Sequence, residues 1–202
     1  MASGPAITQP PSSPQGGATG LLQQAGRLLL WVLLALLLRW AVVEPRWIPS
    51  GSMLPTLQLQ DRILVEKLTP RFGSGVRTGR IVVFHPPVRL QEAGYDRRTA
   101  LIKRVVAVAG DQVEVRDGKL WRNGTPAEPD WAREPMAYAL EPFVVPAGEV
   151  LVLGDNRNAS LDSHLWGPLP EADLIGTAIW RYWPLARFGP VGFSSPHPAE
   201  AA

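Results

Sequence analysis

The chain has no cysteine among its 202 residues, and this absence excludes several kinds of chemistry at once. Disulfide bonds, zinc-thiolate sites and cysteine nucleophiles all require a thiol. Lysine is nearly as scarce, with three residues (Lys67, Lys103 and Lys119) against seventeen arginines. Arginine stays protonated in proteins, whereas a buried lysine can lose its proton and act as a base. The few lysines are therefore the basic residues of most chemical interest.

The chain also lacks a strong net charge, which is +2 at pH 7. This excess is too small to indicate a nucleic-acid partner, and no glycine-rich phosphate loop is present. We expect neither nucleic acid, nor a metal, nor another cofactor. With 46% hydrophobic and 19% charged residues, the composition is that of one globular domain with appendages.

A strongly apolar segment follows an N-terminal tail that has little to bury. Residues 1–20 are rich in proline, glycine, serine and alanine, so we expect a flexible tail there. Residues 28–38 form an uninterrupted run of leucine, tryptophan, valine and alanine. Because leucines occur on every face of this run, a buried helix of a soluble protein is disfavoured. We predict a transmembrane anchor over residues 21–44.

The length and flanks of this anchor leave its topology open. The apolar stretch is about 16 residues long, whereas a spanning helix needs roughly 20, although Arg27 and Arg39 could snorkel toward the interface. A cleavable signal sequence is the alternative, but no small-x-small site follows the run and Pro45 comes just after it. Arginines lie before, within and after the run, so they do not set an orientation.

Beyond residue 44 the sequence changes to short β-like runs separated by turn residues. Asp117-Gly118 and Asn123-Gly124 are hairpin turn signals, whereas five prolines in residues 124–146 favour loop over sheet. We predict a mainly β, antiparallel domain over residues 45–190, with a small inserted lobe at about 112–150 and a flexible tail over 191–202. The predicted strands are residues 62–67, 80–84, 101–109, 112–116, 120–122, 150–153 and 175–182.

Two segments carry candidate catalytic residues. The first, residues 49–56, reads as a tight turn that presents Ser50 and Ser52, although such Gly-Ser segments are often plain loops. In the second, strand alternation places Lys103 on the same face as Leu101 and Val105. Burial on that face would disfavour the ammonium form and make Lys103 a base near neutral pH. The alternative is an edge strand with Lys103 pointing into water.

A third segment, residues 154–164, is a polar cluster between strands. Such clusters often bind calcium, but Asp155 and Asp162 are the only carboxylates here, and calcium takes six to eight oxygen ligands. His164 lies two residues after Asp162, which suggests a Ser-His-Asp triad. We disfavour that arrangement, because this Asp and His already account for each other.

These three segments, in this order, resemble the type I signal peptidases over residues 47–170. The resemblance implies an antiparallel β catalytic domain after one N-terminal transmembrane helix, with Ser52 as nucleophile and Lys103 as base. It also implies an oxyanion hole made by the Ser52 backbone N–H and the Ser50 hydroxyl. Ser160 is then expected to orient the lysine amine, with Asp162 supporting that serine. This chemistry is sound, because a neutral lysine can activate a hydroxyl without a histidine.

The resemblance further implies the substrate and the location. The substrates would be signal peptides of secreted or lumenal preproteins, cut after small-x-small sites. Shallow apolar pockets for the small side chains would be lined by Ile48, Met53, Leu57 and Ile102. The protein would cross a plasma or thylakoid-type membrane once, in contact with lipid and near the export translocon, with its catalytic domain on the exoplasmic or lumenal side.

Three residues depart from the family pattern. Asn158 and Ala159 replace a more familiar Asp-Asn pair, and His164 stands where arginine is common, so the residue at this position can pair with Asp162 only in a pH-dependent way. The stretch that contains His164 resembles the branch of photosynthetic membranes. Two other functions stay open: a non-catalytic, membrane-tethered β scaffold, and a self-cleaving repressor-type Ser-Lys peptidase. The apolar segment and the absence of a DNA-binding helical domain argue against the latter.

Overall fold

The computed structural model describes residues 17–71, 76–127 and 134–191 in two compact units, residues 1–40 and 41–202. In the first unit it describes one helix, α1 (Gly17–Ala41). This helix begins four residues inside the predicted tail, and the rest of that tail lies outside the described residues. Among the described helices, none combines the length and the apolar character that crossing a membrane requires.

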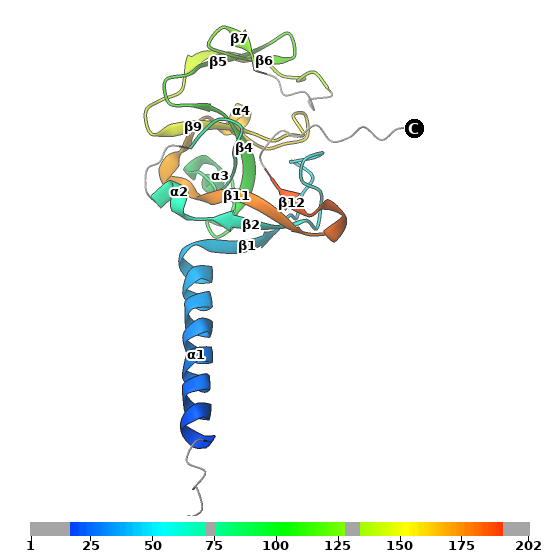
Figure 1. Cartoon of the computed structure of the whole chain (residues 1–202). Helices are drawn as coiled ribbons and strands as arrows, with labels where there is room; N and C mark the ends of the chain where they lie inside the picture. Colours follow the sequence, from blue (N-terminus) through cyan, green and yellow to red (C-terminus); the bar gives the residue numbers. More distant parts are fainter. Residues whose placement is uncertain (1–16, 72–75, 128–133, 192–202) are drawn as a thin grey trace, which may run out of the picture. The chain divides into compact units, whose positions relative to one another are not determined.

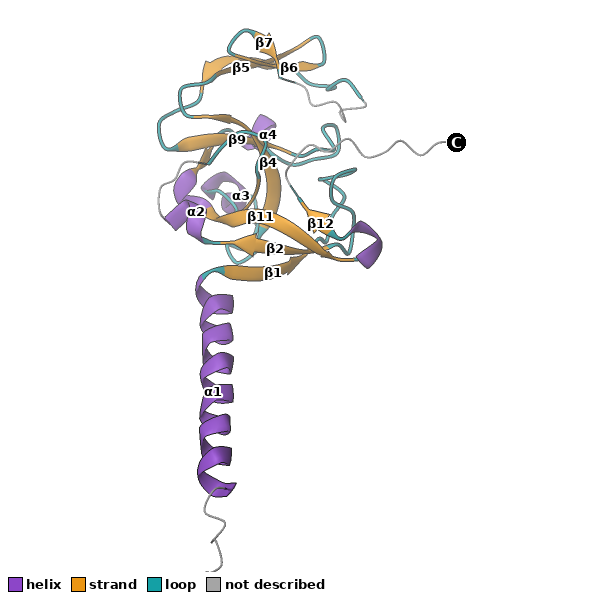
Figure 2. Ribbon diagram, in the orientation of Figure 1, coloured by secondary structure: helices purple, strands orange, loops and turns teal. Residues whose placement is uncertain are grey.

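The second unit is built on a large antiparallel sheet (Figures 1 and 2). The strands follow the order β1-β2-β11-β3-β4-β9-β10, and β12 pairs with β11. Every neighbouring pair is antiparallel. The strands are β1 (Val43–Trp47), β2 (Arg62–Glu66), β3 (Ile81–Phe84), β4 (Leu101–Val108), β9 (Glu149–Leu153), β10 (Leu169–Pro170), β11 (Leu174–Trp183) and β12 (Gly189–Pro190).

A smaller sheet occupies the segment predicted as an inserted lobe, in the strand order β7-β6-β5-β8. Figure 1 shows β5, β6 and β7 at the opposite end of this unit from β1 and β2. The strands of this smaller sheet are β5 (Gln112–Arg116), β6 (Lys119–Arg122), β7 (Thr125–Pro126) and β8 (Leu140–Val144). The remaining described elements are short: α2 (Leu68–Arg71), α3 (Val88–Glu92), α4 (Ser163–Trp166), η1 (Glu171–Asp173) and η2 (Leu185–Arg187).

The mainly β, antiparallel architecture is confirmed, and all seven predicted strands are present within one residue at either end. Asp117 and Gly118 have φ values of 50° and 70°, and Asn123 and Gly124 of 52° and 77°, so both hairpin turns form as predicted. The expectation of more loop than sheet over residues 124–146 holds for the described part of that stretch, which also contains the short strands β7 and β8. Apart from Val191, the predicted C-terminal tail lies outside the described residues.

Among the strands that the structure describes, five were not predicted from sequence patterns, and each of these contains a proline. They are β1, β7, β8, β10 and β12, with Pro45, Pro126, Pro142, Pro170 and Pro190. The first four lie at sheet edges, and β12 is off the main strand path. Proline cannot donate a ladder hydrogen bond, so strands that contain it are confined to such positions.

The interior position of β4 determines what surrounds the candidate base. This strand pairs with β3 on one side and β9 on the other. Its side chains alternate between core clusters: Ile102 packs with one buried group, whereas Val105 packs with another. A lysine in the middle of this strand therefore cannot reach bulk water freely, and the edge-strand alternative for Lys103 was wrong.

Candidate active site

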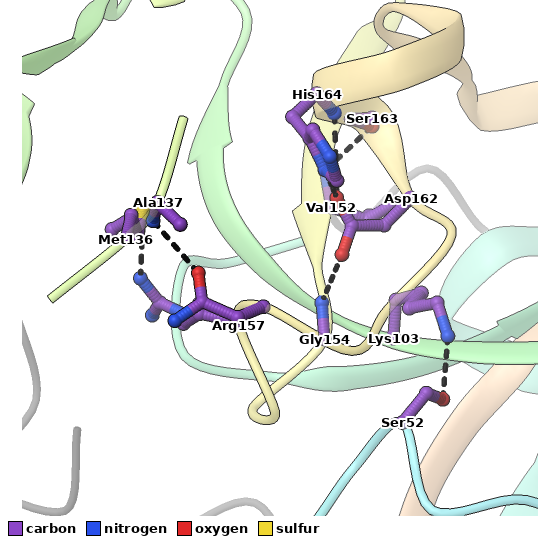
Figure 3. Close-up of polar contacts among 11 residues, drawn as sticks. Ser52, Lys103, Met136, Ala137, Val152, Gly154, Arg157, Asp162, Ser163 and His164 are labelled. Atoms are coloured by element: carbon purple, nitrogen blue, oxygen red, sulfur yellow. Dashed lines mark hydrogen bonds and ion pairs between the residues drawn. The ribbon is translucent and has the colours of Figure 1, made fainter. Parts of the chain in front are cut away.

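Ser52 and Lys103 lie in direct contact, although 51 positions separate them in the sequence. Lys103 Nζ donates a hydrogen bond to Ser52 Oγ over 2.6 Å, as Figure 3 shows. The two residues are only 9% and 5% exposed. The serine lies in the turn between β1 and β2, and the lysine lies on β4. The contact is thus formed between a loop and the centre of the large sheet.

The surroundings of Lys103 favour its neutral form. Burial lowers its pKa from 10.5 to about 8, while the negative charges of Asp162 and Asp155 act in the opposite direction and raise it. A neutral amine has a lone pair that can accept the Ser52 hydroxyl proton. The geometry and the lowered pKa together meet the requirements for a general base next to a nucleophile.

The turn that carries Ser52 is held from two sides. Within the turn, Leu57 N donates to Met53 O over 2.9 Å, and both of these side chains are fully buried. From the loop after β9, Asn156 N donates to Ser52 O over 3.1 Å, and Asn156 Nδ2 donates to Gly51 O over 3.2 Å. Sequence reasoning missed Asn156, because its partners are backbone atoms about a hundred residues away.

Gly154 brings a third segment against this turn. A Cβ added at Gly154 would overlap Ser160 Oγ and would lie 2.5 Å from Ser52 O. A side chain here would therefore push the two segments apart, so the close approach requires glycine. Ser160 thus lies near Ser52, as the predicted site requires. In the described structure its buried hydroxyl has no hydrogen-bond partner, so its contact with the lysine amine stays a prediction.

Asp162 is fully buried and connects two parts of the site. One carboxylate oxygen accepts the Gly154 backbone N–H over 2.8 Å, and the other lies 2.7 Å from His164 Nδ1. The same residue caps α4 by accepting the His164 backbone N–H over 3.3 Å. Since His164 pairs with Asp162 while Lys103 contacts Ser52, the arrangement is that of a Ser-Lys pair.

Ser50 lies close enough to take part in the same chemistry. Its Oγ is 3.4 Å from Ser52 Oγ, and either hydroxyl can be the donor. A hydroxyl at this position could stabilise negative charge that develops on an oxygen bonded to a carbon under attack by Ser52. Its role in an oxyanion hole stays a prediction.

A buried ion pair explains Arg104, for which the sequence offered no account. Arg104 Nε and Nη2 donate to the two oxygens of Asp155, each over 2.7 Å, and Nη1 donates to Gly79 O. Both side chains are almost fully buried. The signal was available, because an arginine inside an apolar strand needs a carboxylate and Asp155 occurs in the third polar segment.

The four predicted pocket residues share one buried cluster. Ile48, Met53, Leu57 and Ile102 are 0–8% exposed and pack together in the core. The structure brings them together, whereas their contact with a substrate stays a prediction. A surface hollow of about 700 Å³ lies elsewhere, between β1, β2 and β11, and none of the predicted site residues lines it.

A serine hydroxyl in hydrogen-bond contact with a buried lysine, carried on an antiparallel β domain, is the arrangement expected of a hydrolase of the Ser-Lys class. A sequence profile of the family described as signal peptidase, peptidase S26, matches residues 21–183. The chain therefore belongs to the signal peptidase family and is a serine endopeptidase, as predicted.

Individual relatives of this chain carry the names of signal or processing peptidases. "Probable signal peptidase I-1" of Synechocystis is 50% identical over 82% of this chain and 84% of that protein. "Signal peptidase I" of Leptolyngbya laminosa is 43% identical over 91% and 90%. "Thylakoidal processing peptidase 1, chloroplastic" of Arabidopsis thaliana is 48% identical over 76% of this chain and 46% of that protein. These relatives confirm the resemblance to the branch found in photosynthetic membranes.

Proposed function

We propose that this chain removes N-terminal signal peptides from exported preproteins, with Ser52 as nucleophile and Lys103 as base. The observation that carries the proposal is the 2.6 Å contact between a buried lysine amine and a serine hydroxyl. The peptide bond cut would follow a small-x-small sequence. Neither a cofactor nor a metal takes part in this mechanism.

The reaction would proceed in two stages, acylation of Ser52 and hydrolysis of the acyl-enzyme. Ser52 Oγ attacks the carbonyl carbon of the scissile bond as its proton passes to neutral Lys103. The tetrahedral intermediate then loses the amine, which takes the proton from Lys103, and leaves an acyl group on Ser52. Water attacks this acyl-enzyme as Lys103 accepts its proton, and the proton returns to Ser52 when the signal peptide leaves.

Ser50, Ser160 and Asp162 would support these steps. The Ser52 backbone N–H and the Ser50 hydroxyl would donate to the oxyanion of the tetrahedral intermediate. Ser160, whose hydroxyl lies near Ser52 and has no hydrogen-bond partner among the described residues, would hold the Lys103 amine while that amine keeps its contact with Ser52. Asp162 would support Ser160 through the Gly154 backbone that it binds.

The apolar residues Ile48, Met53, Leu57 and Ile102 would form the walls that admit only small side chains at the first and third positions before the cut. Their burial supports this role, because a wall packed into the core cannot retreat from a larger substrate side chain.

We further propose that α1 attaches the chain to a membrane as a single-pass anchor, with the peptidase domain on the exoplasmic or lumenal side. The support is the exposure of its apolar side chains, which is 68% for Leu28, 66% for Trp31 and 55% for Leu36. Apolar surface of this extent requires a cover, and lipid suits a helix that is apolar on every face. Proximity to the translocon would follow from the substrate.

The direct test is cleavage of a preprotein with an Ala-x-Ala site by the full-length protein in detergent or lipid. Wild type should cut after the second alanine, and Ser52→Ala and Lys103→Ala should be inactive. Lys119→Ala is the matched control, because Lys119 is exposed on the small sheet and should not affect cutting. Absence of cutting by folded wild type would favour the scaffold function instead.

The anchor is tested separately by alkaline extraction of membranes from cells that express the chain. Retention of the full chain in the membrane pellet, and its release when residues 21–40 are deleted, is the expected result. Release of the full chain itself would refute the single-pass anchor without bearing on catalysis.

A further inference from the structure

The segment of residues 135–138, which precedes β8, docks on the loop that carries Asp162. Asn158 Oδ1 accepts the Ala137 backbone N–H over 2.8 Å, and Asn158 Nδ2 donates to Pro135 O over 2.9 Å. The Tyr138 ring stacks on the His164 ring, with centroids 3.9 Å apart and planes at 13°. Asn158 and His164 are two of the residues that depart from the family pattern, and both contact this one segment.

Arg157 makes a further contact with the 135–138 segment. Arg157 Nη1 donates to Met136 Sδ over 3.9 Å, and both residues are buried. Figure 3 shows Met136 and Ala137 beside Arg157, and on the other side His164, Asp162 and Gly154 leading toward Lys103 and Ser52. The 135–138 segment therefore packs against the same loop that supports the Ser-Lys pair.

His164 connects this docking contact to the reacting groups. Its Nδ1 lies 2.7 Å from Asp162, whose second oxygen holds the Gly154 backbone N–H. Gly154 in turn packs directly on Ser52 O. If the imidazole donor were lost, the buried Asp162 carboxylate would keep only the long 3.3 Å bond from the His164 backbone N–H on that oxygen and could turn away from Gly154. The backbone around Ser52 would then lose one of its supports.

We propose that His164 is a positioning residue of the peptidase reaction, which donates to Asp162 from an orientation that the 135–138 segment fixes by stacking Tyr138 on the ring. This inference rests on the proposed function of Ser52 and Lys103. The pairing of Asn158 with the same segment gives the family departures at 158 and 164 a common explanation. The titratable and charged side chains named in these contacts are His164, Asp162, Tyr138, Arg157 and, through Asp162, Lys103.

Two substitutions distinguish the role of the His164 N–H donor from the role of its stacking ring. His164→Asn keeps an N–H that can reach Asp162 but loses the stacking ring, whereas His164→Phe keeps the ring and loses the donor. A misplacement of about 1 Å near reacting atoms can cost roughly 100-fold in rate, so His164→Phe should lower kcat at least ~10-fold with KM changed less than ~2-fold. His164→Asn should recover part of this loss, because it keeps the donor without the ring that orients it. The matched control is His85→Phe, because the His85 side chain is exposed and, among the contacts described, its ring bonds only the Arg97 carbonyl.

Wild-type kcat in His164→Phe, or an equal loss in His164→Asn, would overturn the proposal while leaving the Ser-Lys mechanism intact. A second test uses the exposed Asn158, whose substitution should leave folding unharmed. Asn158→Ala should lower kcat several-fold in wild type but have no further effect in His164→Phe, since both act through one contact. Additive losses would overturn the link to the 135–138 segment.

A third readout does not depend on cleavage. The Gly154 amide resonance in the NMR spectrum of the folded protein should move in His164→Phe and stay near its wild-type position in His164→Asn. An unmoved resonance in His164→Phe would overturn the positioning role. If wild type fails to cut preprotein while His164→Phe still moves the Gly154 resonance, the proposed function alone would be overturned.

Discussion

The protonation of Lys103 should control the rate over a pH range that ordinary lysines do not reach. Burial lowers the pKa of Lys103 to about 8, against the opposing charges of Asp162 and Asp155. Only the neutral amine can accept the Ser52 proton, so kcat/KM should follow the neutral fraction of Lys103 in the free enzyme. The expected profile rises with unit slope below pH 8 and levels off above it.

The magnitude follows from this pKa. At pH 7 about one-tenth of Lys103 is neutral, and at pH 9 about nine-tenths, so kcat/KM should rise about 10-fold between them. A lysine with the ordinary pKa would be neutral in only about 3 molecules per 10,000 at pH 7. Burial therefore increases the population of active base about 300-fold at that pH.

The assay is cleavage of a fluorogenic peptide with an Ala-x-Ala site, measured under kcat/KM conditions from pH 6 to 10 at constant ionic strength. Asp162→Asn removes a charge that raises the pKa of Lys103, so its profile should rise at lower pH than that of wild type, at a lower plateau. A wild-type profile that is flat from pH 6 to 9, or still rises steeply above pH 10, would refute Lys103 as a base tuned by burial.

Four further substitutions test the site and its energetics. Lys103→Arg should abolish cleavage although it keeps the charge, because a guanidinium cannot act as a base; cleavage near the wild-type rate would refute the Ser-Lys pair. Ser50→Ala should lower kcat by about 100–1,000-fold, the usual cost of one oxyanion donor, and unchanged single-turnover rates would contradict that role. Lys103→Met should raise the free energy of unfolding at pH 7 by up to about 3 kcal/mol, because folding lowers the pKa of Lys103 from 10.5 to about 8 and so disfavours its charged form. Above pH 8 the folded lysine is neutral, so the gain measured in thermal unfolding should shrink between pH 8 and 10.5 and vanish above it. Arg104→Ala should destabilise the domain by about 3–5 kcal/mol in denaturant unfolding, because it leaves Asp155 buried and unpaired, and a loss below 1 kcal/mol would contradict this.

The fold could be predicted from the sequence wherever hydrophobic alternation and turn residues agree. Asp117-Gly118 and Asn123-Gly124 adopt positive φ, and the runs that flank the first turn carry valine on one side and leucine and tryptophan on the other, so these hairpins were predicted correctly. The strands containing Pro45 or Pro142 were missed, because proline argues against a ladder position in any local reading. Only their pairing partners, distant in sequence, show that these are edge positions.

The residues of the site, like the strands, could be predicted where local sequence determines them and not where contacts distant in sequence do. The resemblance to the family identified Ser52 and Lys103, and the structure places them in contact. Strand alternation alone could not decide whether Lys103 faces core or water, because the answer depends on β3 and β9 covering both edges of β4. The stacking of Tyr138 on His164 joins a loop to the short helix α4, and the sequences of these two segments carry no pattern that pairs them.

The two carboxylates near Lys103 would defeat its function if they were unpaired. A buried negative charge beside an amine favours the ammonium form and raises its pKa. In this site Asp155 binds Arg104 through both oxygens, and Asp162 is held by His164 and the Gly154 amide. Each carboxylate therefore already directs its oxygens at other donors, so burial outweighs both charges and the pKa of Lys103 settles at about 8. The site thus combines buried acids, which organise the loop around Ser52, with a lysine that remains available as a base.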